Sequence, residues 1–232
     1  MIELNNITKV YGSQTVLNIQ NLTIKQGESF GLVGNNGAGK TTMFRCILDL
    51  VRATSGTVLI RNKNVASDES WKKFTGSFLD EGFLIDFLTP EEYFRFVADV
   101  YQLSEGDLNE FYREFEDFFN HEILGKKKLI RNLSSGNRQK IGIAAALMPE
   151  PEILVLDEPF NNLDPTTQIR LKNLLKSLQK EKEITILISS HDLNHITEVC
   201  NRIVILHEGV IVHDLATNQD TLKILEEYFT VR

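Results

Sequence analysis

The 232-residue sequence predicts an α/β fold, and three observations support this prediction. Short apolar runs, typical of strands buried on both faces, alternate with segments of helical spacing. A glycine-rich segment stands directly between one such strand and a helix. The middle of the chain contains no strand-like run. With 42% hydrophobic and 25% charged residues, the chain has the composition of a globular protein that buries a large core.

The strands are expected where short apolar runs are bounded by turn-forming residues. These runs lie near Ile2–Val10, Val16–Ile24, Ser29–Val33, Thr57–Ile60, Gly76–Leu79, Ile153–Leu156, Ile184–Ile188 and Ile203–Val212. The last run is interrupted by Glu208-Gly209, which predicts a hairpin. No internal repeat or low-complexity tract is present, so solenoids and propellers are excluded.

The middle of the chain predicts a helical lobe over residues 89–148, inserted between core segments 1–88 and 149–232. Thr89, Pro90 and Glu92 form the start signal of one helix. A second helix carries an apolar stripe of Phe111, Phe115, Phe118 and Phe119. We interpret the stripe as core; a docking surface for a partner is the alternative. The Lys126–Lys128 run is interpreted as a solvated loop.

The charge and the cysteines limit the possible functions. A net charge of −7, from 25 basic and 32 acidic residues, provides no basic surface for nucleic acid or anionic lipid. No segment approaches the roughly 18 consecutive apolar residues of a spanning helix, and Met1–Leu4 does not begin a secretory signal. We therefore expect a cytosolic chain without direct membrane insertion. Cys46 and Cys200 lie in apolar patterns, which favours buried, reduced thiols over a disulfide or a metal site.

The glycine-rich segment predicts a P-loop that binds nucleotide phosphates. It reads Gly34, Asn35, Asn36, Gly37, Ala38, Gly39, Lys40, Thr41 and Thr42. Glycines let consecutive backbone N–H groups point at phosphate oxygens, and the helix that follows adds its positive dipole end. Lys40 is expected at the β- and γ-phosphates, and the Thr41 hydroxyl is expected on Mg²⁺. A plain glycine-rich turn with a surface lysine is the alternative.

Two carboxylates end the later apolar strand Ile153–Leu156. Asp157 is expected to orient Mg²⁺, directly or through water. Glu158, one residue further, points elsewhere and is expected to act as the general base on the attacking water. The alternative is a pair of solvated acids at a strand end. The two motifs together predict an ATP- and Mg²⁺-dependent site.

A further motif, Leu133-Ser134-Ser135-Gly136-Asn137, stands about 20 residues before these two acids. Alone it reads equally well as a cap for the helix Asn137–Met148. In its order relative to the other motifs it resembles the LSGGQ signature, and nearly the whole chain resembles the ATP-binding subunit of ABC (ATP-binding cassette) transporters.

Three more elements follow the order of that family. Tyr11 resembles the aromatic residue that stacks on adenine, although without the family it reads as a strand residue. Asn162-Leu163-Asp164 resembles the D-loop that crosses to a partner subunit, although Asp164-Pro165 also starts a helix with an apolar leucine face. His191 resembles the switch histidine at the γ-phosphate, although a lone histidine is usually structural.

The sequence departs from the family pattern at two places. Asp80 aligns with the position where the family usually has Gln, and it is a candidate Mg²⁺ ligand that adds negative charge near the phosphates. Ser135 and Asn137 replace Gly and Gln in the signature. We expect nucleotide binding to persist despite these two replacements.

The resemblance implies a P-loop NTPase core with an antiparallel β subdomain and an inserted helical lobe. It further implies ATP held between the P-loop of one subunit and Ser134–Asn137 of a second copy or a paralogous subunit. An integral membrane permease is the implied partner, and the cytoplasmic face of the membrane is the implied location. An ABC-type ATPase without a transport role is the main alternative, and a P-loop kinase is a third. Nothing in the sequence encodes the cargo or its direction.

Overall fold

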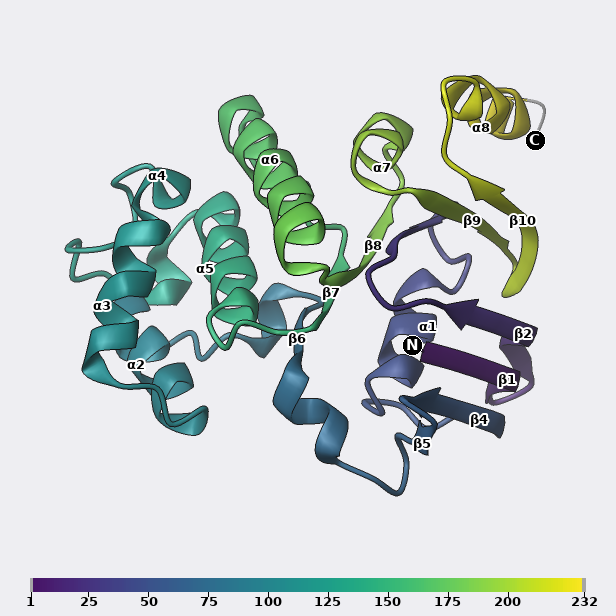
Figure 1. The fold of residues 1–232 in the computed structure, drawn as a ribbon, viewed down its shortest axis with the longest axis horizontal. Coiled ribbons are helices and arrows are strands. Elements are labelled where there is room, and N and C mark those ends of the chain that lie inside the picture. Colours follow the sequence, from purple (N-terminus) through teal and green to yellow (C-terminus); the bar gives the residue numbers. More distant parts are fainter. Residues whose placement is uncertain (1, 231–232) are drawn as a thin grey trace.

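The computed structural model describes residues 2–230 and contains two β-sheets (Figure 1). Their strands are β1 Ile2–Tyr11, β2 Gln14–Ile24, β3 Ser29–Val33, β4 Ser55–Ile60, β5 Lys63–Asn64, β6 Thr75–Phe78, β7 Ile153–Asp157, β8 Thr185–Ser190, β9 Arg202–His207 and β10 Val210–Ala216. The smaller sheet has the order β2-β1-β4-β5, and all its pairs are antiparallel. The larger sheet has the order β10-β9-β3-β8-β7-β6.

The larger sheet is parallel from β9 to β6, and only β10 runs antiparallel at one edge. Strands β3, β7 and β8 are buried along their whole length, which explains why their sequences are continuous apolar runs. Because these strands are parallel, the loops that follow β3, β7 and β8 emerge at the same edge of the sheet. This edge is where the predicted phosphate-binding residues lie.

The helices cover both faces of the larger sheet. They are α1 Lys40–Ile47, α2 Pro90–Val100, α3 Glu105–Glu114, α4 Glu116–Phe119, α5 Ser135–Leu147, α6 Pro165–Lys182, α7 Leu193–Val199 and α8 Thr221–Thr230, together with short 3₁₀ turns η1 Ser70–Phe74, η2 Glu81–Phe83 and η3 Ile130–Asn132. Alternate residues of β7 face opposite sides. Leu154 and Leu156 pack into the core with α5, α6 and α7, whereas Ile153 and Val155 pack with α1 and the smaller sheet.

Helices α2 to α5 lie between β6 and β7 in the chain and gather on one side of the molecule (Figure 1). The predicted start of α2 is confirmed, since the Thr89 hydroxyl accepts from the backbone N–H of Glu92 at 3.3 Å and the Glu92 carboxylate accepts from that of Thr89 at 2.8 Å. The single helix predicted for the phenylalanine stripe is wrong, because the helix breaks at Phe115 into α3 and α4. All four phenylalanines are buried, as the core interpretation requires.

Helix α5 packs unusually close to strand β6. A Cβ atom at Gly142 would lie 2.0 Å from the ring of Phe78, and a Cβ atom at Gly76 would lie 2.0 Å from the carbonyl oxygen of Ala146. Only glycine fits at these two positions without a shift of the helix or the strand. The helix that begins at the signature motif is thus seated directly on an edge strand of the sheet.

The remaining expectations have clear outcomes. Each predicted strand is present, but strand β5 and helices α7 and α8 were not predicted. Cys46 and Cys200 are free and buried as predicted, and burial raises their thiol pKa values to about 11 and about 12. Within residues 2–230, no helix is both long and apolar enough to cross a bilayer. The division into a core and a lobe over residues 89–148 stays a prediction.

Candidate nucleotide site

The glycine-rich loop runs from the end of β3 to the start of α1. Gly37 and Gly39 have positive φ angles of 83° and 106°, a backbone conformation that other residues rarely adopt. Gly34 is pressed against β9, since a Cβ atom there would lie 2.3 Å from the carbonyl oxygen of Leu206. Residues 35–37 are exposed, while Gly34 and residues 38–40 are buried. The tip of the loop is therefore open to a ligand, whereas its two ends are held in place by the residues that bury them.

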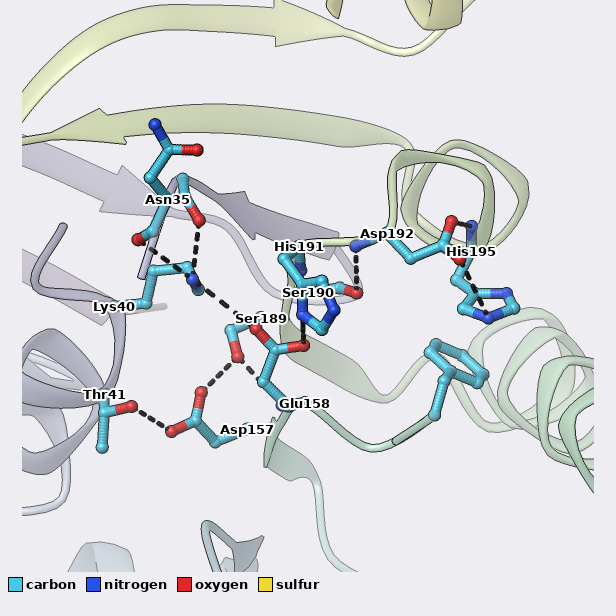
Figure 2. A network of polar contacts seen from close by, with 12 residues as sticks. Asn35, Lys40, Thr41, Asp157, Glu158, Ser189, Ser190, His191, Asp192 and His195 are labelled. Carbon is cyan, nitrogen blue, oxygen red and sulfur yellow. Dashed lines mark hydrogen bonds and ion pairs between the residues drawn. The ribbon is translucent and has the colours of Figure 1, made fainter. Parts of the chain in front are cut away.

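Lys40 is the first residue of α1, and only 7% of it is exposed. Its ammonium group donates to the carbonyl oxygen of Gly34 at 2.7 Å and lies 3.5 Å from Oε1 of Glu158 (Figure 2). A buried ammonium group requires such partners. The structure therefore places the predicted phosphate-binding lysine at the carboxylate of the predicted general base.

Asp157 ends strand β7 and is joined by hydrogen bonds to helix α1 and strand β8 (Figure 2). The hydroxyl groups of Thr41 and Ser189 both donate to its carboxylate. Burial raises the pKa of Asp157, and the two hydroxyl hydrogen bonds partly offset this effect. Ser189 was not predicted as a site residue; its place at the end of β8, two residues before His191, was the available signal.

Glu158 lies where the segments that follow β3, β7 and β8 meet. Its Oε1 faces Lys40, its Oε2 lies 2.9 Å from Nδ1 of His191, and its own backbone N–H donates to the Ser189 hydroxyl at 3.0 Å. Glu158 has a positive φ angle of 49°, which turns the chain away from the β7 direction. The side chain of His191 is 56% exposed and that of Glu158 is 21% exposed. The predicted lysine, base and histidine are thus brought together at one edge of the sheet.

The signature residues begin helix α5. The Ser134 hydroxyl accepts from the backbone N–H of Asn137 at 3.2 Å. The motif therefore does cap the helix, as the first of its two interpretations predicted. Gly136 lies against the D-loop, because a Cβ atom there would be 2.5 Å from the carbonyl oxygen of Asn162. Within residues 2–230, no hydrogen bond or ion pair joins residues 134–137 to the P-loop of the same chain.

Asp164 caps helix α6. Its carboxylate accepts from the backbone N–H of Thr167 at 3.0 Å and from the Thr167 hydroxyl, and these hydrogen bonds lower the pKa of Asp164. The leucine face predicted for this helix is present, since Leu171 and Leu175 are buried and Leu174 and Leu178 pack against the same core. Asp164 therefore has a structural role as the cap of α6, and its role toward a partner subunit stays a prediction.

Two polar contacts that the sequence did not predict tie helix α5 to the site. The Gln139 amide donates to the carbonyl oxygen of Glu158 at 3.2 Å. The Arg138 guanidinium pairs with Glu81 and donates to the carbonyl oxygen of Leu133 at 2.8 Å. Both residues follow the signature directly, so the start of α5 is anchored to the residue after β7 and to the segment after β6.

Asp80 and Tyr11 lie at the margins of the site. Asp80 follows β6, the strand that pairs with β7, and its carboxylate accepts from Arg45 of α1 at 3.3 Å and from the backbone N–H of Gly82 at 2.8 Å. Arg45 was not predicted. Tyr11 is the last residue of β1 and is 47% exposed, with the Lys9 ammonium 4.7 Å from its ring centroid. The Tyr11 ring is accessible, as stacking on a base would require.

This loop, lysine and acidic strand end, set at the carboxyl edge of a parallel sheet, define a P-loop nucleotide-binding protein. Residues 17–161 match the family model described as ABC transporter, so the chain belongs to the ABC transporter family. It is an ATP-binding and ATP-hydrolysing subunit of such a transporter, and the alternative of an ABC-type ATPase without a transport role is not favoured.

Individual relatives agree with this assignment. The chain is 36% identical over 217 residues to the bacitracin transport ATP-binding protein BcrA of Bacillus licheniformis, covering 93% of this chain and 69% of BcrA. It is 32% identical over 225 residues to the methionine import ATP-binding protein MetN 1 of Bacillus thuringiensis subsp. konkukian, covering 92% and 66%. Among solved structures, the dimeric cassette MJ0796 bound to ADP and Pi superposes with a TM-score of 0.83 at 27% identity, covering 94% and 99%.

Proposed function

We propose that ATP is hydrolysed at the edge of the sheet where Lys40, Asp157, Glu158 and His191 converge. The observation that carries this proposal is the contact of one carboxylate, that of Glu158, with both Lys40 and His191. The backbone N–H groups of residues 34–42 and the ammonium of Lys40 bind the phosphates. Glu158 accepts a proton from the attacking water, and His191 fixes the Glu158 carboxylate and senses the γ-phosphate.

The Thr41 hydroxyl and the Asp157 carboxylate are suited to hold Mg²⁺ together with the nucleotide. Both groups offer the oxygen ligands that this ion prefers, and they already lie within hydrogen-bond distance of one another. A divalent cation would also offset the free-energy cost of burying the charged Asp157 carboxylate. Bound there, Mg²⁺ would neutralise phosphate charge. Asp80 is a further proposed ligand, which requires its carboxylate to exchange Arg45 for the ion.

A second subunit is proposed to complete the site. Within residues 2–230, the backbone N–H groups of Ser135 and Gly136 have no hydrogen-bond acceptor, and Ser134 is exposed. This start of α5 faces the D-loop of its own chain and not the P-loop. In a head-to-tail dimer, Ser134, Ser135, Gly136 and Asn137 reach the γ-phosphate held by the partner, with Asp164 and its loop between the two sites. Tyr11 stacks on the adenine of its own nucleotide.

The membrane partner is proposed to bind over the segment after β6 and the outer face of α2. Phe83, Phe87, Phe96 and Val100 are each between 47% and 65% exposed there. Phe96 and Val100 are one helical turn apart on α2, so they share one face. An integral membrane permease that covers these side chains would hold the protein at the cytoplasmic face of the membrane and transmit the nucleotide state through the predicted lobe of residues 89–148.

Calorimetry tests the nucleotide site directly. We expect Mg·ATP to bind the wild-type chain with micromolar affinity and to be turned over when no other phosphate acceptor is present. Lys40→Ala removes the buried ammonium and should abolish tight binding, whereas Lys63→Ala, which alters an exposed lysine paired with Asp68, should not. Retained micromolar affinity in Lys40→Ala would contradict the proposed role of the loop.

A further inference from the structure

A cleft of about 430 Å³ lies on the side of the molecule opposite the nucleotide site. It is bounded by α3, by the loop from α5 to β7, by the last turns of α6 and by Ile184. Pro151 and Ile184 precede β7 and β8, whereas Asp157, Glu158 and His191 lie at or just beyond the other ends of these strands. The 13 residues of α5 separate the cleft from Ser134 by about 20 Å. We call this feature the α3–α6 cleft.

The floor of the α3–α6 cleft is apolar. Phe111 and Phe115 line it from the predicted lobe, Leu147 from the end of α5, and Leu174 and Leu178 from α6. All five side chains belong to the main hydrophobic core or pack against it. A concave apolar floor of this size is typical of a small-molecule site.

The rim of the α3–α6 cleft is acidic. Asp107, Glu110 and Glu114 follow one another along α3 at spacings of three and four residues, so their carboxylates lie on one face of the helix. Hydrogen bonds from Ser104 lower the pKa of Asp107, which keeps it charged. Within residues 2–230, none of these three acids forms an ion pair with a lysine, an arginine or a histidine.

The opposite wall of the cleft adds no net positive charge. Lys182 at the end of α6 is the one basic residue that lines the cleft in the described part of the chain, and it is paired with Glu150, which also lines it, at 3.0 Å. The three α3 carboxylates are therefore uncompensated. They create a negative potential over an apolar surface, and this combination attracts a ligand that is apolar and cationic.

We propose that the α3–α6 cleft binds a small organic cation with an apolar body. The body occupies the floor formed by Phe111, Phe115, Leu147, Leu174 and Leu178, and the positive charge faces Glu110 and Glu114. The ligand contacts both α3 and α6. This site goes beyond ATP binding and hydrolysis, and it neither shares a residue with the proposed nucleotide site nor depends on it.

A pair of ions with the same shape and opposite charge tests this proposal. Tetraphenylphosphonium should bind the full chain saturably in calorimetry, and tetraphenylborate should bind at least about tenfold more weakly because the rim repels it. Saturating Mg·ATP should leave phosphonium binding unchanged, because the cleft and the nucleotide site lie at opposite edges of the sheet. Equal affinity for the two ions, or displacement by Mg·ATP, would overturn the assignment.

Substitutions locate the binding site. Glu110→Gln and Glu114→Gln each remove one exposed charge and should weaken phosphonium binding about two- to fivefold. The same loss should appear in wild-type protein when the salt concentration is raised. The matched control Glu226→Gln changes an exposed glutamate on α8 and should have no effect. If the double variant Glu110→Gln/Glu114→Gln, shown to be folded by circular dichroism, bound as tightly as Glu226→Gln, the proposal would be wrong.

Discussion

The ammonium nitrogen of Lys40 lies 3.5 Å from Oε1 of Glu158, so the proposed phosphate ligand and the proposed general base form an ion pair. A γ-phosphate at the proposed site would compete with this carboxylate for the Lys40 ammonium group. In the proposed mechanism, nucleotide binding would therefore free the Glu158 carboxylate to act as the base.

Replacing the base should separate binding from turnover. Glu158→Gln keeps the shape of the side chain but removes its ability to take a proton, so we expect ATP turnover to fall by about 10²- to 10⁴-fold. ATP should bind at least as tightly as in the wild type, because Lys40 loses its competing partner, and dimers should accumulate in size-exclusion chromatography. Unchanged phosphate release would remove Glu158 from this role.

Linked dimers of defined composition test whether the signature acts on the partner. Combining Lys40→Ala in one subunit with Ser134→Arg in the other leaves one intact composite site, so about half of the wild-type activity is the upper limit. The matched control places both substitutions in one subunit beside a wild-type partner, and this dimer should be inactive. If each subunit instead used its own signature, the activities of the two dimers would be exchanged.

The pair of Arg45 and Asp80 should influence nucleotide affinity. Arg45→Ala frees the Asp80 carboxylate for Mg²⁺, and because both side chains are partly exposed we expect KM for Mg·ATP to fall by no more than about fivefold. Adding Asp80→Asn removes the proposed ligand and should raise KM again. Arg61→Ala, which breaks an ion pair with Glu152 on another part of the surface, serves as the control. Equal KM values for Arg45→Ala and Arg61→Ala would show that the pair has no such effect.

The burial of Asp157 should make the protein less stable as the pH rises. The folded-state pKa of this carboxyl lies above its unfolded value, so stability is highest below the unfolded pKa and is lost as the pH rises through the folded pKa. At pH 7 we therefore expect Asp157→Asn to raise Tm while it lowers ATP turnover. A calorimetric melt without nucleotide measures this directly. A lower Tm for the variant at pH 7 would mean that the Thr41 and Ser189 hydrogen bonds outweigh the burial.

The close contact of α5 with β6 predicts a large packing effect. Gly142→Ala places a methyl group on the Phe78 ring and should destabilise the fold by about 1–3 kcal/mol in denaturant unfolding. Phe78→Leu should recover part of that loss in the double variant. Gly106→Ala on α3, where the nearest atom to a new Cβ is the Ser104 hydroxyl at 3.3 Å, should be neutral or stabilising. Similar unfolding free energies for the two alanine variants would contradict the close packing.

The sequence predicted those features that are encoded within one short, continuous segment. The P-loop combines a buried strand, glycines and a helix start, and Asp157 and Glu158 end an apolar run, so both could be recognised and placed at one sheet edge. The capping box of α2 was equally local. The break at Phe115 was not predictable, because the apolar spacing of the stripe is compatible with one helix or with two short ones.

The contacts that depend on tertiary packing could not be read from the sequence. Ser189 binds Asp157 only because β8 lies beside β7, and Arg45 meets Asp80 only because α1 lies near the end of β6. The contact of Gln139 with Glu158 has the same origin. Single polar residues of this kind are common on any surface, so their types and spacing gave no reason to select them.

The glycine contacts between α5 and β6 have a mechanical consequence. With Gly142 against Phe78 and Gly76 against Ala146, neither element can slide past the other without a steric clash. The first turn of α5 and the Asp80 turn therefore lie together at the same end of one stiff unit, where Arg138 pairs with Glu81. A ligand or subunit that displaces one of them also displaces the other, whatever happens in the softer loops around them.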